Sequence, residues 1–217
     1  ELAASADSVL TLGEAMRENL LHAGVPPERI SVLPNGVGED YLLTGHDTDL
    51  ARSGARSSLG LDHDAFYWGT VSSLVDYEGL DLLVRVTALL APGHPQLRLL
   101  IVGDGVQREP LIRLAAELGI ADRCIFPGRV PRHDAPQYHA ALDVFAVPRR
   151  DLAVTRAVTP LKPVEAMASG VPVMASKLPA LAELVSDQDN GLLIEPADTG
   201  AWMEALERLM IDPSLRS

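Results

Sequence analysis

From residue 66 onward, short apolar runs alternate with segments whose apolar residues recur at helical spacing. One such segment places Leu111, Ala115 and Leu118 on the same helix face. Gly119 follows as a residue type that commonly ends a helix. Nearly continuous apolar strands that alternate with helices indicate a parallel sheet with helices on both faces. The pattern therefore predicts an α/β fold with a Rossmann-like, doubly wound parallel sheet.

This region divides into strands and helices of ordinary length, separated by glycine-rich or polar turns. The strands are predicted over residues 66–71, 97–103, 124–128, 142–148, 171–176 and 191–196. The helices are predicted over residues 79–90, 108–119, 135–143, 163–170, 178–185 and 200–210.

The first 40 residues carry a smaller βαβ-like pattern. It predicts a strand over 8–12, a helix over 13–24 and a second strand over 30–36, followed by a Pro-Asn-Gly turn. Residues 37–61 are polar and predict a linker with one short helix. The chain begins at Glu1, already inside patterned sequence, and we therefore expect it to be a piece of a longer protein.

The composition narrows the class of protein. With 47% hydrophobic residues, a chain of 217 residues can bury at least one sizeable core, and 22% charged residues are typical of a soluble globular protein. No apolar run approaches the roughly 20 residues that span a bilayer. The single cysteine, Cys124, lies in an apolar run, which predicts a buried and inert thiol. These features predict a cytoplasmic protein.

The net charge restricts the partners. With 18 basic and 30 acidic residues, the formal net charge is −12, which repels nucleic acid at long range. A small phosphorylated ligand remains compatible, because it needs only local positive charge and oriented N–H groups. No cluster of histidine or cysteine has metal-ligand spacing, so we expect no metal and no nucleic-acid partner.

Three loops that follow predicted strands are candidate ligand contacts, because ligands of open α/β sheets bind beyond the carboxyl ends of the strands. The first loop offers hydroxyl groups, although an ordinary connecting loop would look the same. The second resembles half of a dinucleotide fingerprint, but Arg108 occupies the third glycine position, which disfavours NAD. The third begins at a glycine that ends a strand. The candidate residues in these loops are Gly69, Thr70, Ser72, Ser73, Gly103, Asp104, Gly105, Gly128, Arg129 and Val130.

A fourth loop leads into the stretch VTPLKPVEAMASGVPV, residues 158–173. Lys162, one of only two lysines in the chain, stands three residues before Glu165, and Pro163 suits the first helical position. Such a junction can hold phosphate on its cations and ribose hydroxyls on its carboxylate. Glu165 could equally serve only to stabilise the start of the helix, because a carboxylate in the first turn interacts favourably with the helix dipole. The candidates here are the cluster Arg149, Arg150, Arg156 and Lys162, together with Leu161, Val164 and Glu165.

Taken together and in order, these motifs resemble the retaining GT-B glycosyltransferases of family 4. The resemblance covers nearly the whole chain and is far more specific than any one motif. It rests on residues 34–38, 69–90, 99–111, 126–131, 143–150, 160–176 and 190–210.

The resemblance implies a two-domain hexosyltransferase that moves a sugar, with retention, from a nucleotide-diphosphate sugar to a glycan or lipid-linked acceptor. Residues 1–40 would end the N-terminal acceptor domain, 41–60 would be the interdomain linker, and 61–217 would be the C-terminal nucleotide-sugar-binding domain. The missing N-terminal domain would be a partner in cis, so this piece alone would be inactive. The family default is a UDP-sugar co-substrate without metal or cofactor, and it allows peripheral membrane association of the full-length protein.

The sequence departs from the family in the residues that bind the diphosphate. The family usually has an arginine after the first-loop glycine and a lysine before the closing glycine of that loop, and these positions hold Thr70 and Glu78. We therefore hypothesise that Lys162, helped by Arg150 or Arg156, supplies the lost charge and stabilises the leaving group.

A second departure concerns the paired glutamates of the family, which are separated by seven residues. The second corresponds to Glu165 and is expected on the ribose hydroxyls, whereas the first falls on Ala157. The YEG and PLKP variants resemble a subgroup associated with cell-surface or exopolysaccharide assembly. Two alternatives remain open: a sugar-nucleotide epimerase of the same architecture, and a non-catalytic nucleotide-sugar-binding domain.

Overall fold

A computed structural model describes residues 2–42 and 48–216, and its central feature is a parallel sheet in the strand order β5-β4-β3-β6-β7-β8. Apolar residues fill these strands almost without interruption, as a sheet buried on both faces requires. The predicted fold class is confirmed. The strands are β3 Phe66–Val71, β4 Leu97–Val102, β5 Cys124–Gly128, β6 Val144–Val147, β7 Val173–Ser176 and β8 Gly191–Ile194.

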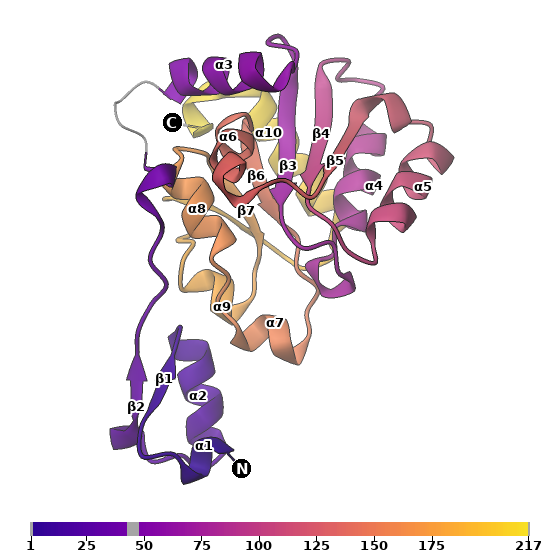
Figure 1. The fold of residues 1–217 in the computed structure, drawn as a ribbon. Helices are drawn as coiled ribbons and strands as arrows, with labels where there is room; N and C mark the ends of the chain where they lie inside the picture. Colours follow the sequence, from indigo (N-terminus) through magenta and orange to yellow (C-terminus); the bar gives the residue numbers. More distant parts are fainter. Residues whose placement is uncertain (1, 43–47, 217) are drawn as a thin grey trace.

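Helices cover both faces of this sheet (Figure 1). One face packs against α4 (Asp81–Leu90), α5 (Arg108–Glu117) and α10 (Thr199–Ile211). The other face packs against α8 (Lys162–Ala168) and α9 (Pro179–Ala182). Helix α6 (Ala135–Ala140) lies beside α8 on this second face, with α3 (Thr48–Leu59) next to it. Among the residues described, no helix combines the length and the apolar character needed to traverse a bilayer.

The two faces of the sheet carry separate cores because side chains of a strand alternate between them. In β3, Trp68 belongs to the core shared with α4 and α10, while the neighbouring Tyr67 belongs to the core on the other face. Trp202 of α10 is fully buried in the first core. Phe145 of β6 is fully buried in the second. The alternation thus fixes which helices each strand residue meets.

Most predicted elements are present; β3 and β5 have the predicted bounds, and the ends of the other strands lie up to four residues inside theirs. The run predicted over 142–148 gives β6 only over Val144–Val147, because Pro148 has no N–H to continue the ladder. Helix α7 (Ala153–Ala157) was not predicted, since its five residues are too short to show a period. Its start is fixed locally by the Leu152 N–H, which donates to Thr155 Oγ1 at 3.0 Å.

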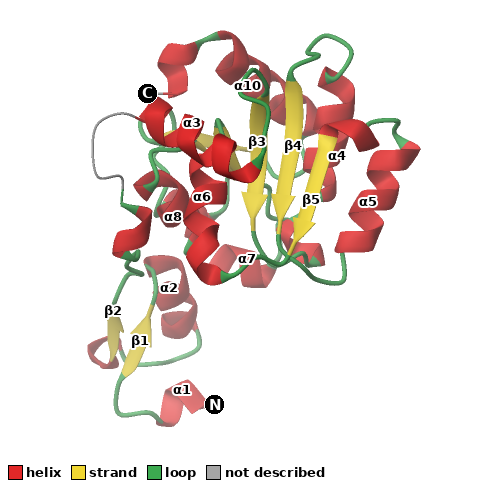
Figure 2. Cartoon of the chain, turned by 45° about the horizontal axis from the view of Figure 1, so that its top comes forward, coloured by secondary structure: helices red, strands yellow, loops and turns green. Residues whose placement is uncertain are grey.

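The N-terminal residues form a second, two-stranded parallel sheet from β1 (Val9–Thr11) and β2 (Ile30–Val32). Helix α2 (Glu14–His22) connects them, and the short helix α1 (Leu2–Ser5) precedes them. Figure 2 shows this small sheet well separated from the large one. Contact between the two parts runs through α2, which packs on α7 and α9.

A single carboxylate links the two parts of the chain. Glu183, just after α9, accepts hydrogen bonds from the backbone N–H groups of Glu14 at 2.8 Å and Ala15 at 2.6 Å. These N–H groups belong to the first turn of α2 and have no acceptor within the helix. Glu183 therefore caps a helix that lies far away in the sequence.

The region predicted as a linker contains more structure than expected. Helix α3 has 12 residues and packs on α6, while residues 43–47 lie outside the described ranges. Arg56 of α3 is buried and lies 2.6 Å from Asp143, through Nη2 and Oδ2. The same arginine donates to the backbone oxygens of Ala65 at 3.1 Å and Ala141 at 3.0 Å. This helix is therefore tied firmly to the edge of the large domain.

Candidate functional site

A cavity of about 560 Å³ opens at the carboxyl edge of the large sheet. From β3 the chain adds β4 and β5 on one side of the sheet, and it then adds β6, β7 and β8 on the other side. The strand order therefore reverses between β3 and β6. Ligands of such sheets bind at this switch point. The cavity is lined by Tyr41, Val71, Ser72, Ser73, Val102, Gly103, Asp104, Gly105, Arg129, Val130, Ala135, Lys162 and Glu165.

The structure brings most of the predicted site residues to this one cavity. All four candidate loops contribute to its wall. The predicted residues that line it are Ser72, Ser73, Gly103, Asp104, Gly105, Arg129, Val130, Lys162 and Glu165. The predicted residues outside the lining are Gly69, Thr70, Gly128, Arg149, Arg150, Arg156, Leu161 and Val164.

The first two loops are joined directly by backbone hydrogen bonds. The Ser72 N–H donates to the Val102 oxygen at 2.8 Å, and the Leu74 N–H donates to the Asp104 oxygen at 2.9 Å. Gly103 allows this approach, because a Cβ there would lie 1.8 Å from the Ser72 oxygen and its φ of +134° disfavours other residues. The glycines that suggested a dinucleotide fingerprint thus let two loops pack closely.

Gly69 and Thr70 are part of strand β3 and do not line the cavity. Both lie inside β3, and Thr70 is buried. A Cβ at Gly69 would lie 1.8 Å from the Leu100 oxygen of the neighbouring strand. Gly128, at the end of β5, has a φ of +84° and accepts a hydrogen bond from the Gly103 N–H at 2.9 Å. These residues shape the edge of the sheet on which the loops stand.

Helix α8 presents Lys162 and Glu165 together. The Leu161 oxygen accepts hydrogen bonds from the N–H groups of Val164 at 2.9 Å and Glu165 at 3.1 Å, which starts the helix at Lys162. Pro163 therefore occupies the second helical position, one later than predicted, where a missing N–H is also tolerated. Residues three apart share a helix face, so the lysine and the glutamate both reach the cavity.

Lys162 belongs to a buried ion cluster with Glu78 and Arg149. Its Nζ lies 3.0 Å from Glu78 Oε1, and the Arg149 Nη2 lies 3.1 Å from the same oxygen. Burial works to raise the pKa of Glu78, but attraction to Lys162 and Arg149 prevails and lowers that pKa below its ordinary value. Burial lowers the pKa of Lys162, and Glu78 opposes this. With all three groups ionised the cluster carries a formal net charge of +1, and Lys162 is its member in the cavity lining.

This cluster changes the expected roles of the arginines. Arg150 lies 2.8 Å from Asp81 through Nη2 and Oδ1, and Arg156 lies 2.9 Å from Asp151 through Nη1 and Oδ1. Neither arginine lines the cavity. Arg149, two residues after the end of β6, is buried and shares the Glu78 carboxylate with Lys162. The next residue, Arg150, is more exposed and pairs with Asp81 instead.

Glu165 lies between Lys162 and two aromatic residues. Its side chain is 17% exposed, and the Tyr41 hydroxyl lies close enough to interact with its carboxylate. Burial raises the pKa of Glu165, against the attraction of Lys162 and Arg132. Burial and the Glu165 charge raise the pKa of Tyr41 to about 12. The His139 ring lies behind this carboxylate, with Nε2 at 3.9 Å from Glu165 Oε2.

No local pattern in the sequence places Tyr41 or Glu78 at the site. Tyr41 lies in the region predicted as a linker, and Glu78 stands where the resemblance would place a lysine. His139 lies in the helix predicted over residues 135–143 and belongs to none of the four candidate loops. Within residues 2–42 and 48–216, no group of histidine, cysteine, aspartate and glutamate could hold a metal ion. Cys124 is half-buried, and burial raises the pKa of its thiol to about 12.

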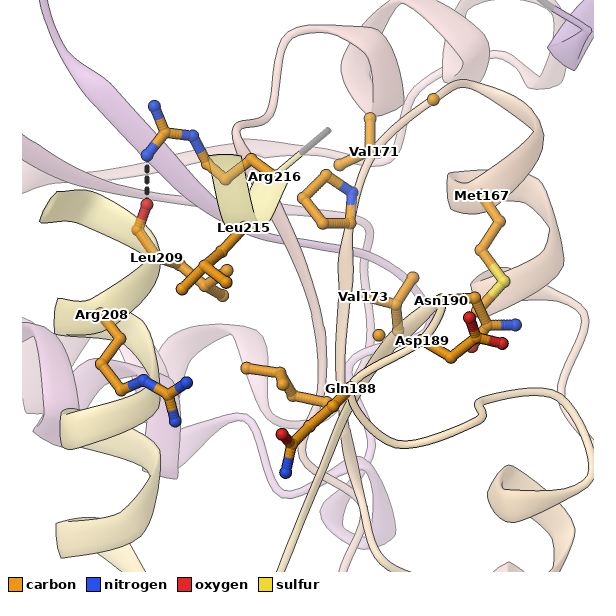
Figure 3. A pocket seen from close by; sticks show the side chains of 14 residues that line it. Met167, Val171, Val173, Gln188, Asp189, Asn190, Arg208, Leu209, Leu215 and Arg216 are labelled. Carbon is orange, nitrogen blue, oxygen red and sulfur yellow. Dashed lines mark hydrogen bonds between the residues drawn. The ribbon is translucent and has the colours of Figure 1, made fainter. Parts of the chain in front are cut away.

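A second cavity, of about 510 Å³, lies near the amino ends of β7 and β8 (Figure 3). Leu209 and Leu215, from α10 and the turn after it, form one side, and Val171 and Val173 form another. Arg216 points away to the Leu209 backbone oxygen, to which it donates. This cavity is mainly apolar and lies at the opposite edge from the four loops. The cavity at the carboxyl edge is therefore the candidate site.

A doubly wound sheet with a polar cavity at its switch point defines a Rossmann-like domain that holds its ligand beyond the carboxyl ends of the strands. Sequence comparison narrows this class to one family. Residues 52–217 match the family described as glycosyl transferases group 1, and the chain belongs to that family.

Among curated relatives, the GDP-mannose-dependent alpha-(1-6)-phosphatidylinositol monomannoside mannosyltransferase of Mycolicibacterium smegmatis is 34% identical over 210 residues. That match covers 96% of this chain and 54% of the relative. The D-inositol 3-phosphate glycosyltransferase of Nocardia farcinica is 34% identical over 220 residues, covering 98% of this chain and 47% of the relative. The chain thus spans about half the length of the curated relatives it matches.

Solved structures agree on the fold. HepE of Anabaena, solved in complex with UDP-glucose, has a TM-score of 0.81 and 27% identity, covering 99% of this chain and 57% of that one. Sucrose-phosphate synthase from Thermosynechococcus elongatus has a TM-score of 0.80 and 26% identity, covering 99% of this chain and 52% of that one. The large domain therefore has the architecture of the C-terminal half of GT-B glycosyltransferases.

Proposed function

We propose that the full-length protein is a hexosyltransferase that moves a sugar from a nucleoside-diphosphate sugar to an acceptor, with retention of configuration. The observation that carries this proposal is the pair Lys162 and Glu165, which α8 presents to one cavity. Family membership supplies the reaction class. In this proposal the cavity holds the nucleotide end of the donor, and no metal or further cofactor takes part.

The diphosphate of the donor is assigned to Lys162. The cluster with Glu78 and Arg149 holds the ammonium of Lys162 at the cavity wall. Negative charge grows on the nucleoside diphosphate as the bond to the sugar breaks, and a fixed cation in a partly dry site stabilises that charge. Glu78 then positions the lysine, and the positive charge that the first loop lacks comes from α8.

The ribose of the donor is assigned to Glu165. An ionised carboxylate accepts hydrogen bonds from two vicinal hydroxyl groups. Burial raises the pKa of Glu165, while the nearby Lys162 and Arg132 favour its ionised form. Ser72, Ser73 and the loop around Gly103 then face the remaining polar groups of the donor. UDP is the first nucleotide to test, because HepE was solved with UDP-glucose. GDP is the second, because the M. smegmatis relative is GDP-mannose-dependent.

The chemical step needs no nucleophile from this chain. The bond between the anomeric carbon and the phosphate oxygen breaks while the acceptor oxygen bonds to the same face of that carbon. A phosphate oxygen of the leaving group takes the acceptor proton. We assign the acceptor to a glycan or lipid-linked glycan of the cell surface, which peripheral membrane association of the full-length protein would suit.

Two measurements on the full-length protein test this function. Thermal-shift screening against UDP-, GDP- and ADP-sugars identifies the nucleotide, and calorimetry then compares wild type with Lys162→Met. Losing one charge-assisted contact is expected to weaken nucleoside diphosphate binding roughly ten- to hundredfold. Lys177→Met is the matched control, because this other lysine is exposed and pairs with Glu195 at 3.4 Å, far from the cavity lining. Undiminished affinity of Lys162→Met would refute the assignment.

A non-catalytic nucleotide-sugar-binding domain is the second candidate, and Ala157 favours it. This alanine stands where the family usually has the first of its two glutamates. Product analysis with and without acceptor separates the two functions. Donor binding without transfer or hydrolysis of the sugar would support the binding domain, whereas transfer to an acceptor would support the enzyme.

A further inference from the structure

His139 is a buried histidine that its surroundings do not satisfy. Its side chain is 0% exposed, and among the described residues neither ring nitrogen has a hydrogen-bond partner. The ring stacks on Phe145, with centroids 4.9 Å apart, and meets Tyr41 edge-on at 5.3 Å. Burial lowers its pKa to about 4, so the imidazole is neutral at neutral pH. A neutral ring still carries one N–H donor.

Packing alone does not account for a histidine at this position. A phenylalanine would stack on Phe145 and meet Tyr41 equally well, without burying two polar nitrogens. Leaving a buried polar group without a partner is costly, and such groups in native structures call for a reason. One carboxylate lies close to the ring: Glu165 Oε2 is 3.9 Å from His139 Nε2.

That distance exceeds hydrogen-bond range by roughly 1 Å. Glu165 is partly exposed at the cavity wall, so a small rotation of its side chain would bring the two atoms together. The Tyr41 hydroxyl is a second neutral group that interacts with the same carboxylate, and both Tyr41 and Glu165 line the cavity. Two neutral donors beside a carboxylate would restrict its rotation and leave its negative charge available to a ligand.

We propose that His139 is a positioning residue for Glu165, which donates through Nε2–H to the carboxylate and aims it at the ribose hydroxyls of the donor. Tyr41 supports the same carboxylate. This inference rests on the proposed function, because it needs Glu165 to meet the ribose. It extends that function by adding a residue that touches no substrate itself.

The test compares UDP with 2′,3′-dideoxy-UDP in calorimetry of the full-length protein. Wild type should prefer UDP. His139→Phe should bind UDP roughly tenfold more weakly, because the carboxylate is no longer aimed, and should bind the dideoxy form as wild type does. His139→Gln, which keeps an N–H donor near Nε2, should recover most of the affinity for UDP. His133→Phe is the control, since that histidine is exposed.

The outcomes that overturn the proposal are distinct. Wild-type UDP affinity in His139→Phe would exclude any positioning role. An equal loss of affinity for both nucleotides would indicate a purely structural role. The same conclusion would follow if His139→Phe and His139→Leu were both already unfolded without urea. Equal binding of UDP and its dideoxy form by wild type would remove the ribose role of Glu165, and His139 with it. Absence of any nucleoside diphosphate binding would instead refute the proposed function itself.

Discussion

Replacing Glu78 by glutamine tests the buried cluster on which the candidate site depends. The Glu78 side chain is buried, and its Oε1 accepts from Lys162 Nζ at 3.0 Å and from Arg149 Nη2 at 3.1 Å. Glutamine keeps the shape and one acceptor oxygen, but it removes the charge and turns an amide toward two cations. The variant therefore isolates the electrostatic part of the cluster.

The size of the effect follows from the geometry. At 3.0 Å, one pair of unit charges attracts by about 5 kcal/mol when the effective dielectric constant is near 20. Burying the charges offsets much of this attraction, yet removing one partner from a buried ion pair costs about 3–5 kcal/mol, because the remaining charge is left uncompensated. Against a total stability of about 5–15 kcal/mol, this loss is large.

Urea denaturation at pH 7 measures the loss, and the buried Trp68 and Trp202 provide the fluorescence signal. Glu109→Gln is the matched control, because its side chain is 67% exposed and pairs at the surface with Arg108, so we expect a change within about 0.5 kcal/mol. In Glu78→Gln/Lys162→Met, removal of a stranded cation should recover part of the loss. A single Glu78→Gln variant as stable as the control would refute the reasoning.

The same variant predicts a pH dependence. The pKa of Glu78 is lowered in the folded protein, so its stabilising effect is present above the ordinary value of 4.5 and is lost as the pH falls through the folded value. The difference in unfolding free energy between wild type and Glu78→Gln should therefore shrink below about pH 4.5. A difference that stays constant down to acid pH would contradict this sign.

Two further changes probe the rest of the fold. Asp143→Ala should lower the unfolding free energy by about 3–5 kcal/mol in urea titrations, because buried Arg56 loses its counter-ion and the Tyr67 N–H loses its acceptor; retained stability would contradict this. Glu183→Ala should cost about 1 kcal/mol and speed proteolysis within α2, because the N–H groups of Glu14 and Ala15 lose their cap. An unchanged cleavage rate would show that α2 is fixed by other contacts.

The sequence by itself determined the sheet, its strands and the loops that form the site. Strand and helix periods depend on residues that are close in the chain, so the apolar runs predicted β3 to β8 without knowledge of their partners. The sequence likewise placed Lys162 and Glu165 together at a strand-to-helix junction, although the helix begins one residue earlier than predicted and includes Lys162. A parallel sheet then brought the loops after its strands to a common edge.

Only the tertiary structure decided which charged and aromatic groups meet at that edge. Glu78 contacts Arg149 and Lys162 across 71 and 84 residues of sequence, and no local pattern encodes such pairs. The same holds for Tyr41, which reaches Glu165 from a segment that reads as a polar linker. Arg150 differs from Arg149 by one position, yet it pairs with Asp81 outside the cavity. Ion pairs and buried contacts form between surfaces that packing brings together, which is why they became visible only in the folded chain.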